Sequence, residues 1–137
     1  MRQEFLLFAE RAEAVGAKIF IHGGAVDRHF VPRNAPTPIQ LMGDIAVGIL
    51  TEWAETNRGH VMAIRIVDED EKQIWGMEAQ LEVGRPPGAK PGQHFRQLLT
   101  IRGPFPVPAR GAYKIVLELD GKPQDPPFRL WVEDMPA

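Results

Sequence analysis

The sequence predicts an all-β protein, folded as a single antiparallel β-sandwich of about eight strands with one short helical turn. Two runs near the end of the chain, residues 113–119 and 128–132, alternate apolar and polar side chains. This period of two is typical of strands that bury one face. Thirteen glycines and thirteen prolines among 137 residues indicate frequent turns. Pro-rich connections separate the apolar runs at the spacing expected of a sandwich.

The first element, residues 5–15, is ambiguous. Phe5, Phe8, Ala9 and Ala12 recur at helical spacing, and Gly16 could end a helix. Propensity alone favours a helix because Ala and Glu dominate the segment. The alternative is a strand that turns at residues 15–17 into a second strand.

The later elements follow from alternation, turn residues and proline. Residues 18–30 predict one strand, with a bulge or bend at Gly23-Gly24. Three prolines make residues 31–38 a loop. Thr51 is a candidate N-cap for a helical turn over residues 51–57. Further strands are predicted over 41–50, 61–67, 72–83, 94–102, 113–119 and 128–132, with a hairpin turn over 68–71 and long connections over 84–92 and 103–111.

The apolar positions of these strands predict one core within a single domain that spans residues 1–137. Its expected members are Phe5, Leu7, Ile19, Ile21, Ile45, Val47, Ile49, Ile64, Ile66, Trp75, Met77, Leu81, Leu99, Tyr113, Ile115, Leu117, Phe128 and Leu130.

Composition restricts the functions that are expected. The formal net charge is −2, and no basic stripe or polybasic cluster occurs, so we expect neither nucleic acid nor a membrane as a partner. The chain has no cysteine and no serine, which argues against thiolate chemistry and covalent acyl transfer. No apolar run approaches the ~20 residues of a membrane span, and the first residues lack a secretory signal. A cytoplasmic location is therefore expected.

Several segments resemble a family of small bacterial proteins, mainly actinobacterial, catalogued only as a domain of unknown function. The matching segments are FLLFAERAEAVGAKIFIHGGAVDR, NRGHVMAIRIVDEDEK, RPPG and FPVPARGAYKIVLELDG. The family typically shows two glycines, a lysine, four apolar residues and three glycines. Here that pattern reads Gly16-Ala17-Lys18 to Gly23-Gly24-Ala25, with two glycines altered. The resemblance implies that residues 5–15 form a strand paired with residues 18–22. It implies no activity, cofactor or site residue.

The candidate metal ligands are His22, Asp27 and His29, since imidazole and carboxylate suit zinc or iron. A regular strand would place Asp27 and His29 on one face and His22 on the other unless the glycines bulge. A third ligand would then come from His60 or His94. The other interpretation is that these are surface or hydrogen-bonded histidines beside a bend.

The acidic run over residues 68–71 is a candidate calcium site because calcium prefers several oxygen ligands. Asp120 and Asp125 could complete it. The other interpretation, which we favour, is a solvated hairpin turn whose Asp bonds the local backbone.

The alternation in the closing hairpin also predicts a candidate contact surface. If Tyr113, Ile115 and Leu130 face the core, then Val116, Arg129 and Trp131 face outward. An outward Trp often marks a contact surface. Trp53, Trp75 and Trp131 could instead form a sugar-stacking platform, and the Pro-rich segments 85–88 and 105–108 could be extended ligands for a partner.

No catalytic set is evident, so we expect a non-enzymatic binding or assembly module without a cofactor, acting through a protein partner or self-association. The alternative is a metal- or calcium-dependent ligand-binding domain. A metal-dependent enzyme would require the histidines to converge.

Overall fold

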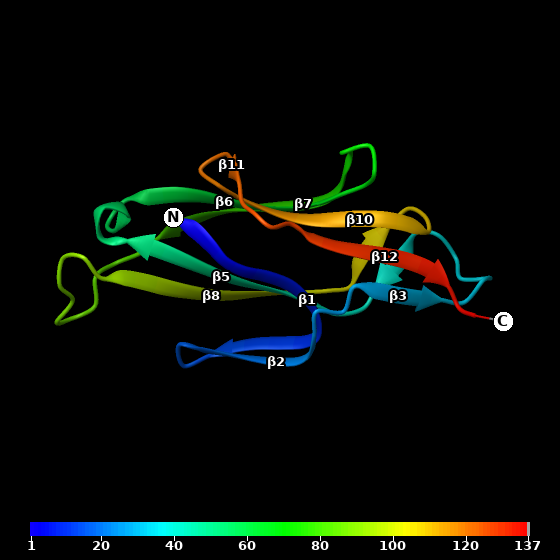
Figure 1. Ribbon diagram of the computed structural model, residues 1–137, viewed down its shortest axis with the longest axis horizontal. Helices are drawn as coiled ribbons and strands as arrows, with labels where there is room; N and C mark the ends of the chain where they lie inside the picture. Colours follow the sequence, from blue (N-terminus) through cyan, green and yellow to red (C-terminus); the bar gives the residue numbers. More distant parts are fainter. Residues whose placement is uncertain (137) are drawn as a thin grey trace.

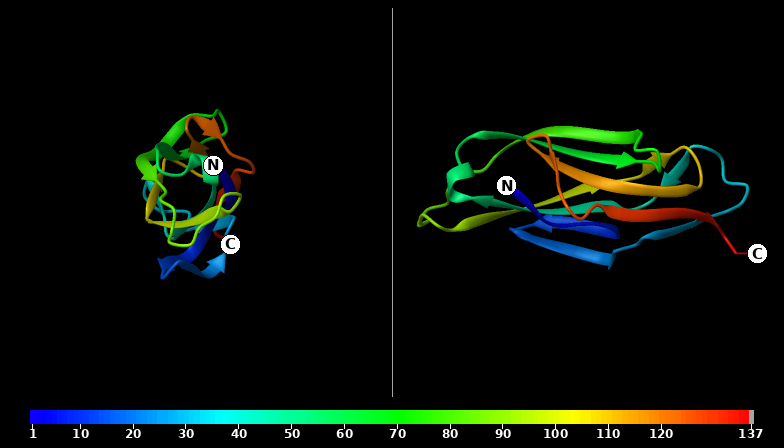
Figure 2. Two further views of the ribbon diagram at one scale, coloured as in Figure 1. Left: turned by 90° about the vertical axis from the view of Figure 1, so that its left-hand side faces the viewer. Right: turned by 45° about the horizontal axis from the view of Figure 1, so that its top comes forward.

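The computed structural model describes residues 1–136, and its strands form two main sheets that pack face to face (Figures 1 and 2). The smaller sheet has the order β2 (Lys18–Gly24), β1 (Arg2–Val15), β5 (Asp44–Glu52), β8 (His94–Arg102). The larger sheet has the order β3 (Arg28–Val31), β12 (Phe128–Asp134), β10 (Gly111–Leu119), β6 (Gly59–Val67), β7 (Gln73–Glu82), and β11 (Lys122–Pro123) pairs with β10. A two-stranded ribbon joins β4 (Ile39–Leu41) to β9 (Phe105–Val107). The all-β prediction is confirmed.

The chain crosses between the sheets where one continuous strand was predicted over residues 18–30. It leaves β2 at Gly24 and enters β3 at Arg28, in the other sheet. The connection bonds to both sheets, because Val26 N donates to Phe8 O at 2.9 Å and Trp131 N donates to Asp27 O at 2.7 Å. β3 pairs parallel to β12, whereas the other strand pairs are antiparallel within the described chain.

The ambiguous first segment is a strand and not a helix, as the family resemblance implied. β1 pairs with two strands: its first half pairs with β5 and its second half with β2. Ala9, where the two halves meet, lies opposite both Asp44 and Gly24. Figure 1 shows the strand doubling back, so that its second half and β2 form a hairpin beside the smaller sheet. The buried carboxylate of Asp44 accepts a hydrogen bond from Ala12 N at 2.9 Å just beyond Ala9.

This hairpin covers the outer face of the smaller sheet. Ala46 points away from the sandwich core on β5, yet it is fully buried, in a cluster with Ala9 and Ala12. Four residues predicted for the sandwich core complete this second cluster: Phe5, Leu7, Ile19 and Ile21. Their predicted placement in the sandwich core was wrong. On β1, Leu6 and Phe8 face the sandwich core, so Phe5 and Leu7 face the opposite side.

The main core lies between the two sheets and includes most of the predicted positions. Trp75, Met77, Leu81, Leu99 and Phe128 pack against it but are only partly buried. The predicted members that are buried are Ile45, Val47, Ile49, Ile64, Ile66, Tyr113, Ile115, Leu117 and Leu130.

The ribbon supplies core residues that sequence patterns missed. Phe105 and Val107 are buried although residues 103–111 were predicted as a connection, and Ile39 and Leu41 are buried on the partner strand. Pro106 is accommodated because a two-stranded ribbon leaves one side of each strand without a ladder bond to make.

The helical turn is a 3-10 helix at Trp53–Glu55, one residue later than its predicted cap implied. Glu52 and not Thr51 is the N-cap, and its N–H donates to the Glu55 carboxylate at 2.9 Å. Thr51 is instead buried in β5, where its hydroxyl donates to Gln97 Oε1 at 2.6 Å.

The two altered glycine positions carry backbone strain. Ala17 has φ 60° in the two-residue loop between β1 and β2, and Ala25 has φ 61° after β2. The left-handed region costs alanine roughly 1–2 kcal/mol, whereas glycine adopts it freely.

We therefore predict that Ala17→Gly and Ala25→Gly each raise the free energy of unfolding by about 0.5–1 kcal/mol, after the greater chain entropy of unfolded glycine is subtracted. Urea denaturation measures this. Ala14→Gly, at an exposed strand position with no positive φ, is the control and should be destabilising. Destabilisation by all three changes would contradict the prediction.

Candidate functional site

The outer face of the larger sheet carries the side chains that the closing hairpin was predicted to turn outward. On β10, every second residue from Tyr113 to Leu119 is buried, whereas Lys114, Val116 and Glu118 are half-buried on the opposite face. On β12, Arg129 is exposed and Trp131 is 40% exposed, while Leu130 between them is buried. The predicted direction of Val116, Arg129 and Trp131 is thus observed.

Two adjacent hollows indent this face and together form what we call the outer groove. The smaller hollow, of about 230 Å³, is lined by Asp68, Glu69, Glu71, Ala112, Tyr113, Lys114, Arg129 and Trp131. The larger, of about 390 Å³, is lined by Arg65, Val67, Glu71, Gln73, Lys114, Val116, Glu118, Pro123, Gln124, Asp125 and Pro127. Glu71 and Lys114 line both. Figure 1 shows the β6–β7 turn and the β11 segment rising above the sheet at either end.

Ion pairs cross the floor of the groove. Arg65 pairs with Glu118 at 3.2 Å and with Glu78 at 3.5 Å, and Lys114 pairs with Glu71. Val67 is buried beneath these long side chains although it lies on the outer face. The groove therefore has ion pairs that lie over a partly apolar floor.

The acidic turn over residues 68–71 forms one wall of the groove. Asp68 Oδ1 accepts hydrogen bonds from the backbone N–H groups of Asp70 and Lys72, each at 2.9 Å. Glu69 Oε1 accepts from Ala112 N at 3.3 Å. The structure thus gives this turn the local backbone bonding that we favoured over a calcium site. Asp125 lines the larger hollow with Glu71, but Asp120 is bonded elsewhere, to His60.

The candidate metal ligands lie on different elements and do not converge. His22 is exposed on β2 of the smaller sheet, Asp27 is exposed in the connection, and His29 is on β3 of the larger sheet. No three His, Asp or Glu residues among residues 1–136 are arranged to hold a metal ion. His60 and His94, the other possible ligands, lie on β6 and β8.

His29 faces the interior. Its ring packs edge-on against Phe8, with centroids 5.0 Å apart, and its buried Nε2 has no hydrogen-bond partner within the described chain. Burial lowers the pKa of His29 below its ordinary value, and a backbone hydrogen bond at Val26 and the charge of Asp27 oppose this shift only in part. The environment suits a neutral, packed imidazole.

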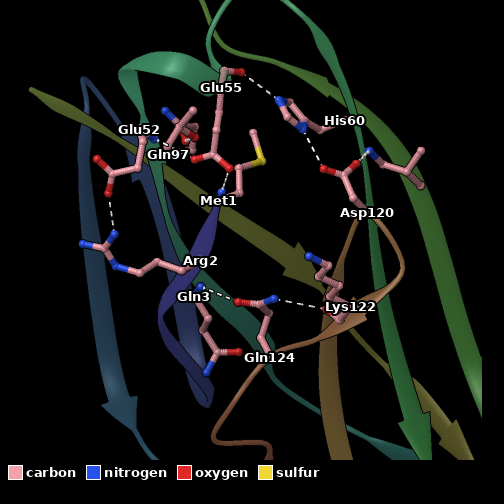
Figure 3. Close-up of polar contacts among 12 residues, drawn as sticks. Met1, Arg2, Gln3, Glu52, Glu55, His60, Gln97, Asp120, Lys122 and Gln124 are labelled. Atoms are coloured by element: carbon pink, nitrogen blue, oxygen red, sulfur yellow. Dashed lines mark hydrogen bonds and ion pairs between the residues drawn. The ribbon is translucent and has the colours of Figure 1, made fainter. Parts of the chain in front are cut away.

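His60 and Asp120 form a polar contact that the sequence did not single out (Figure 3). His60 Nδ1 lies 2.7 Å from Asp120 Oδ2, and its Nε2 donates to the Glu55 carbonyl at 2.7 Å. The hydrogen bond from His60 is the main cause that lowers the pKa of Asp120. Because both nitrogens of this buried ring are engaged, neither is open to a substrate. The pair joins β6 to the β10–β11 turn and the 3-10 helix.

The three tryptophans do not form a common platform. Trp53 lies under the Arg85 guanidinium, 3.6 Å from the ring centroid, and contacts Phe95. Trp75 packs edge-on against Phe105, with centroids 4.9 Å apart. Trp131 alone lines the outer groove. The Pro-rich segment that begins at Arg85 is thereby held against the protein, because Arg85 also donates to Thr56 Oγ1 at 2.6 Å.

The described residues define a two-sheet β-sandwich with a charged groove on the outer face of its larger sheet. The chain belongs to the family of unknown function DUF6941, which matches residues 4–129. A search of curated proteins found no match. Across residues 1–136, no helix has the length and apolar character needed to cross a membrane.

The environment of His29 predicts a pH dependence of stability. Its pKa is lower in the folded protein than in the unfolded chain, so the unfolded chain binds more protons as pH falls below about 6.5. The free energy of unfolding should decrease over that range, and His29→Phe should reduce the decrease. Denaturant unfolding at pH 7.5 and pH 5.0 measures both. Equal losses in the two proteins would contradict the prediction.

The separation of the histidines predicts that zinc leaves the melting temperature unchanged, and the bonded carboxylates of the acidic turn predict the same for calcium. A thermal-shift series with each chloride salt, and with EDTA as the control, measures this. A rise that increases with metal concentration would show binding to the folded state and would revive the metal- or calcium-dependent alternative.

Proposed function

We propose that this protein is a non-enzymatic binding or assembly module that contacts a partner protein, or a second copy of itself, through the outer groove and Trp131. The exposure of Trp131 beside the smaller hollow is the observation that carries this proposal. A large exposed indole beside an exposed arginine on a sheet face is typical of a contact surface, since Trp and Arg are enriched at interfaces.

Strand β3, which pairs with β12, extends this surface. Arg28 lies opposite Trp131 in the β3–β12 register, and Phe30 lies opposite Glu133. Phe30 is 45% exposed, with the Arg28 guanidinium 5.5 Å from its ring centroid. Arg28 also pairs with Glu133 at 2.9 Å, which orders the side chain. The exposed rings of Phe30 and Trp131 and the paired Arg28 therefore project from the same face at this end of the groove.

The hydrogen bonds of His60 and Thr56, which lie outside the groove, indicate a structural role for these two residues. Both nitrogens of His60 are bonded, and the hydroxyl of Thr56 donates to Trp53 O while accepting from Arg85. His60 and Thr56 are thereby engaged in holding the fold. In the groove, by contrast, Arg129 and Trp131 are open to solvent.

We predict that Trp131→Ala weakens partner binding at least about tenfold, the effect expected of a central interface tryptophan. Quantitative affinity enrichment from the source organism finds candidates, and titration calorimetry with the purified candidate measures the change. Sedimentation velocity of wild type and variant measures self-association in the same way.

The matched control is Phe20→Ala, because Phe20 is 51% exposed on the hairpin, away from the groove. Both variants should remain folded, each with a stability loss on the order of 1–2 kcal/mol from the buried part of its ring. A partner or dimer that binds Trp131→Ala as tightly as wild type, or that is lost only with Phe20→Ala, would overturn the proposal.

A further inference from the structure

We infer that two copies of this protein associate through the side of the sandwich where the free edges of β7 and β8 lie, which we call the open side. In this dimer, β7 of each copy pairs with β8 of the other, so that both sheets continue across a two-fold axis. The contact is separate from the outer groove and goes beyond the function proposed above.

The free edges of β7 and β8 lie on the same side of the sandwich. Within the described residues, β7 ends the larger sheet and β8 ends the smaller sheet. At one end of the two strands, the Trp53 ring contacts Arg85, which follows β7, and Phe95, at the start of β8. At the other end, Phe105, which follows β8, packs against Trp75 at the start of β7. The end-on view in Figure 2 shows the two strands on one side.

Neither edge is shortened or interrupted in the way that usually prevents strand pairing. β7 pairs with β6 in unbroken register from Trp75 to Glu82, and β8 pairs with β5 over its whole length. Neither strand contains a proline. Free N–H and C=O groups of an edge strand can bond another strand, and proteins commonly prevent this with short edges, bulges or proline. The edge strand β3, by contrast, has four residues and is followed by Pro32.

The apolar layer between the sheets extends to solvent on the open side. Met77, Ala79 and Leu81 of β7 point into the sandwich but are only half-buried, and so is Leu99 of β8. Residues of the central strands in the same layer, such as Ile64, are fully buried. A second copy placed against the open side would cover these half-buried side chains, which favours association.

The directions of the two edge strands fit a two-fold dimer. β5 and β6 run in opposite directions, because the short turn at Trp53–Glu55 joins them at one end (Figure 1). β8 is antiparallel to β5 and β7 is antiparallel to β6, so β7 and β8 also run in opposite directions. A two-fold axis parallel to the strands then places β7 of each copy antiparallel beside β8 of the other. This closed contact pairs both edges of each copy, whereas a single added strand would pair only one.

The charges on the outer faces of the two strands favour the pairing of β7 with β8. On that face β7 carries Glu78 and Glu82 and no cation, and β8 carries Arg96 and Arg102 and no carboxylate. Pairing of β7 with β7, or of β8 with β8, would bring like charges together, which is unfavourable in a sheet. Pairing of β7 with β8 brings opposite charges together.

Ion pairs within each copy do not remove this difference between the two strands. Glu78 lies 3.5 Å from Arg65, and Arg96 pairs with a glutamate of β1. Glu82 and Arg102 make no ion pair within the part of the chain that the structure describes. The acidic row of β7 and the basic row of β8 therefore each keep a charge without an ion-pair partner.

Sedimentation velocity of the full chain over a range of concentrations tests this inference, and we expect a reversible dimer. Gln80 lies between Glu78 and Glu82 on the outer face of β7 and is exposed, so a substitution there changes the charge of the edge without disturbing the core. Gln80→Lys should raise the dissociation constant of the dimer about tenfold, because the lysine meets the basic row of β8.

The matched control is Gln80→Glu, which adds the opposite charge at the same position. This variant should keep the dissociation constant or lower it. Circular dichroism of both variants should match that of wild type, since the side chain is exposed in the strand.

The remaining outcomes would overturn the inference. A chain that stays monomeric over the whole concentration range would do so, as would a series of assemblies larger than the dimer. A dimer that Gln80→Lys tightens and Gln80→Glu weakens would show pairing of β7 with β7. A dimer that neither change affects would show that β7 is outside the contact.

The outer groove is tested separately by making Trp131→Ala in the Gln80→Lys background, which lacks the dimer contact. Loss of Trp131-dependent binding there, with the wild-type dimer intact, counts against the proposed function and leaves this inference standing. A dimer that Trp131→Ala abolishes and Gln80→Lys preserves would overturn this inference and leave the proposed function standing.

Discussion

The doubling back of β1 at Ala9 decides which surfaces of this protein are open. Its first half must pair with β5 to complete the smaller sheet, and its second half must cover the outer face of that sheet, where Ala46 would otherwise be exposed. Asp44 fixes the change of direction because its buried carboxylate bonds Ala12 N. A buried carboxylate needs such a donor, since an unsatisfied one would be costly.

The two sheets consequently have different outer faces. The smaller sheet is covered by an apolar cluster beneath the hairpin, whereas the larger sheet meets solvent with ion pairs over a partly apolar floor. Long side chains such as Arg65 can bury Val67 while keeping their charges in water. Trp131 and Arg129 lie on β12, between the ion pairs of the groove and the Arg28–Glu133 pair. This is why a contact surface is proposed there and not on the hairpin, although Phe20 is also exposed.

The polar contacts at the other end of the sandwich hold the fold. His60 bonds both Asp120 and the Glu55 carbonyl, and Gln124 Oε1 accepts from Gln3 N at 3.0 Å (Figure 3). These bonds join β1, β6, the 3-10 helix and the β11 segment, which come from distant parts of the sequence. They keep the connection that carries Asp125 and Pro127 in place as one wall of the groove.

The sequence by itself determined much of the local structure: most of the strands and turns, and the outward direction of Val116, Arg129 and Trp131. Alternation of apolar residues and the demands of glycine and proline act over a few neighbours, so they are visible in the chain. Tertiary structure decided which strands pair. It placed Phe5 and Leu7 outside the sandwich core, separated His22 from His29 in different sheets, and set Lys114 opposite Arg129. Those outcomes depend on contacts between residues far apart in the chain, and no local pattern records them.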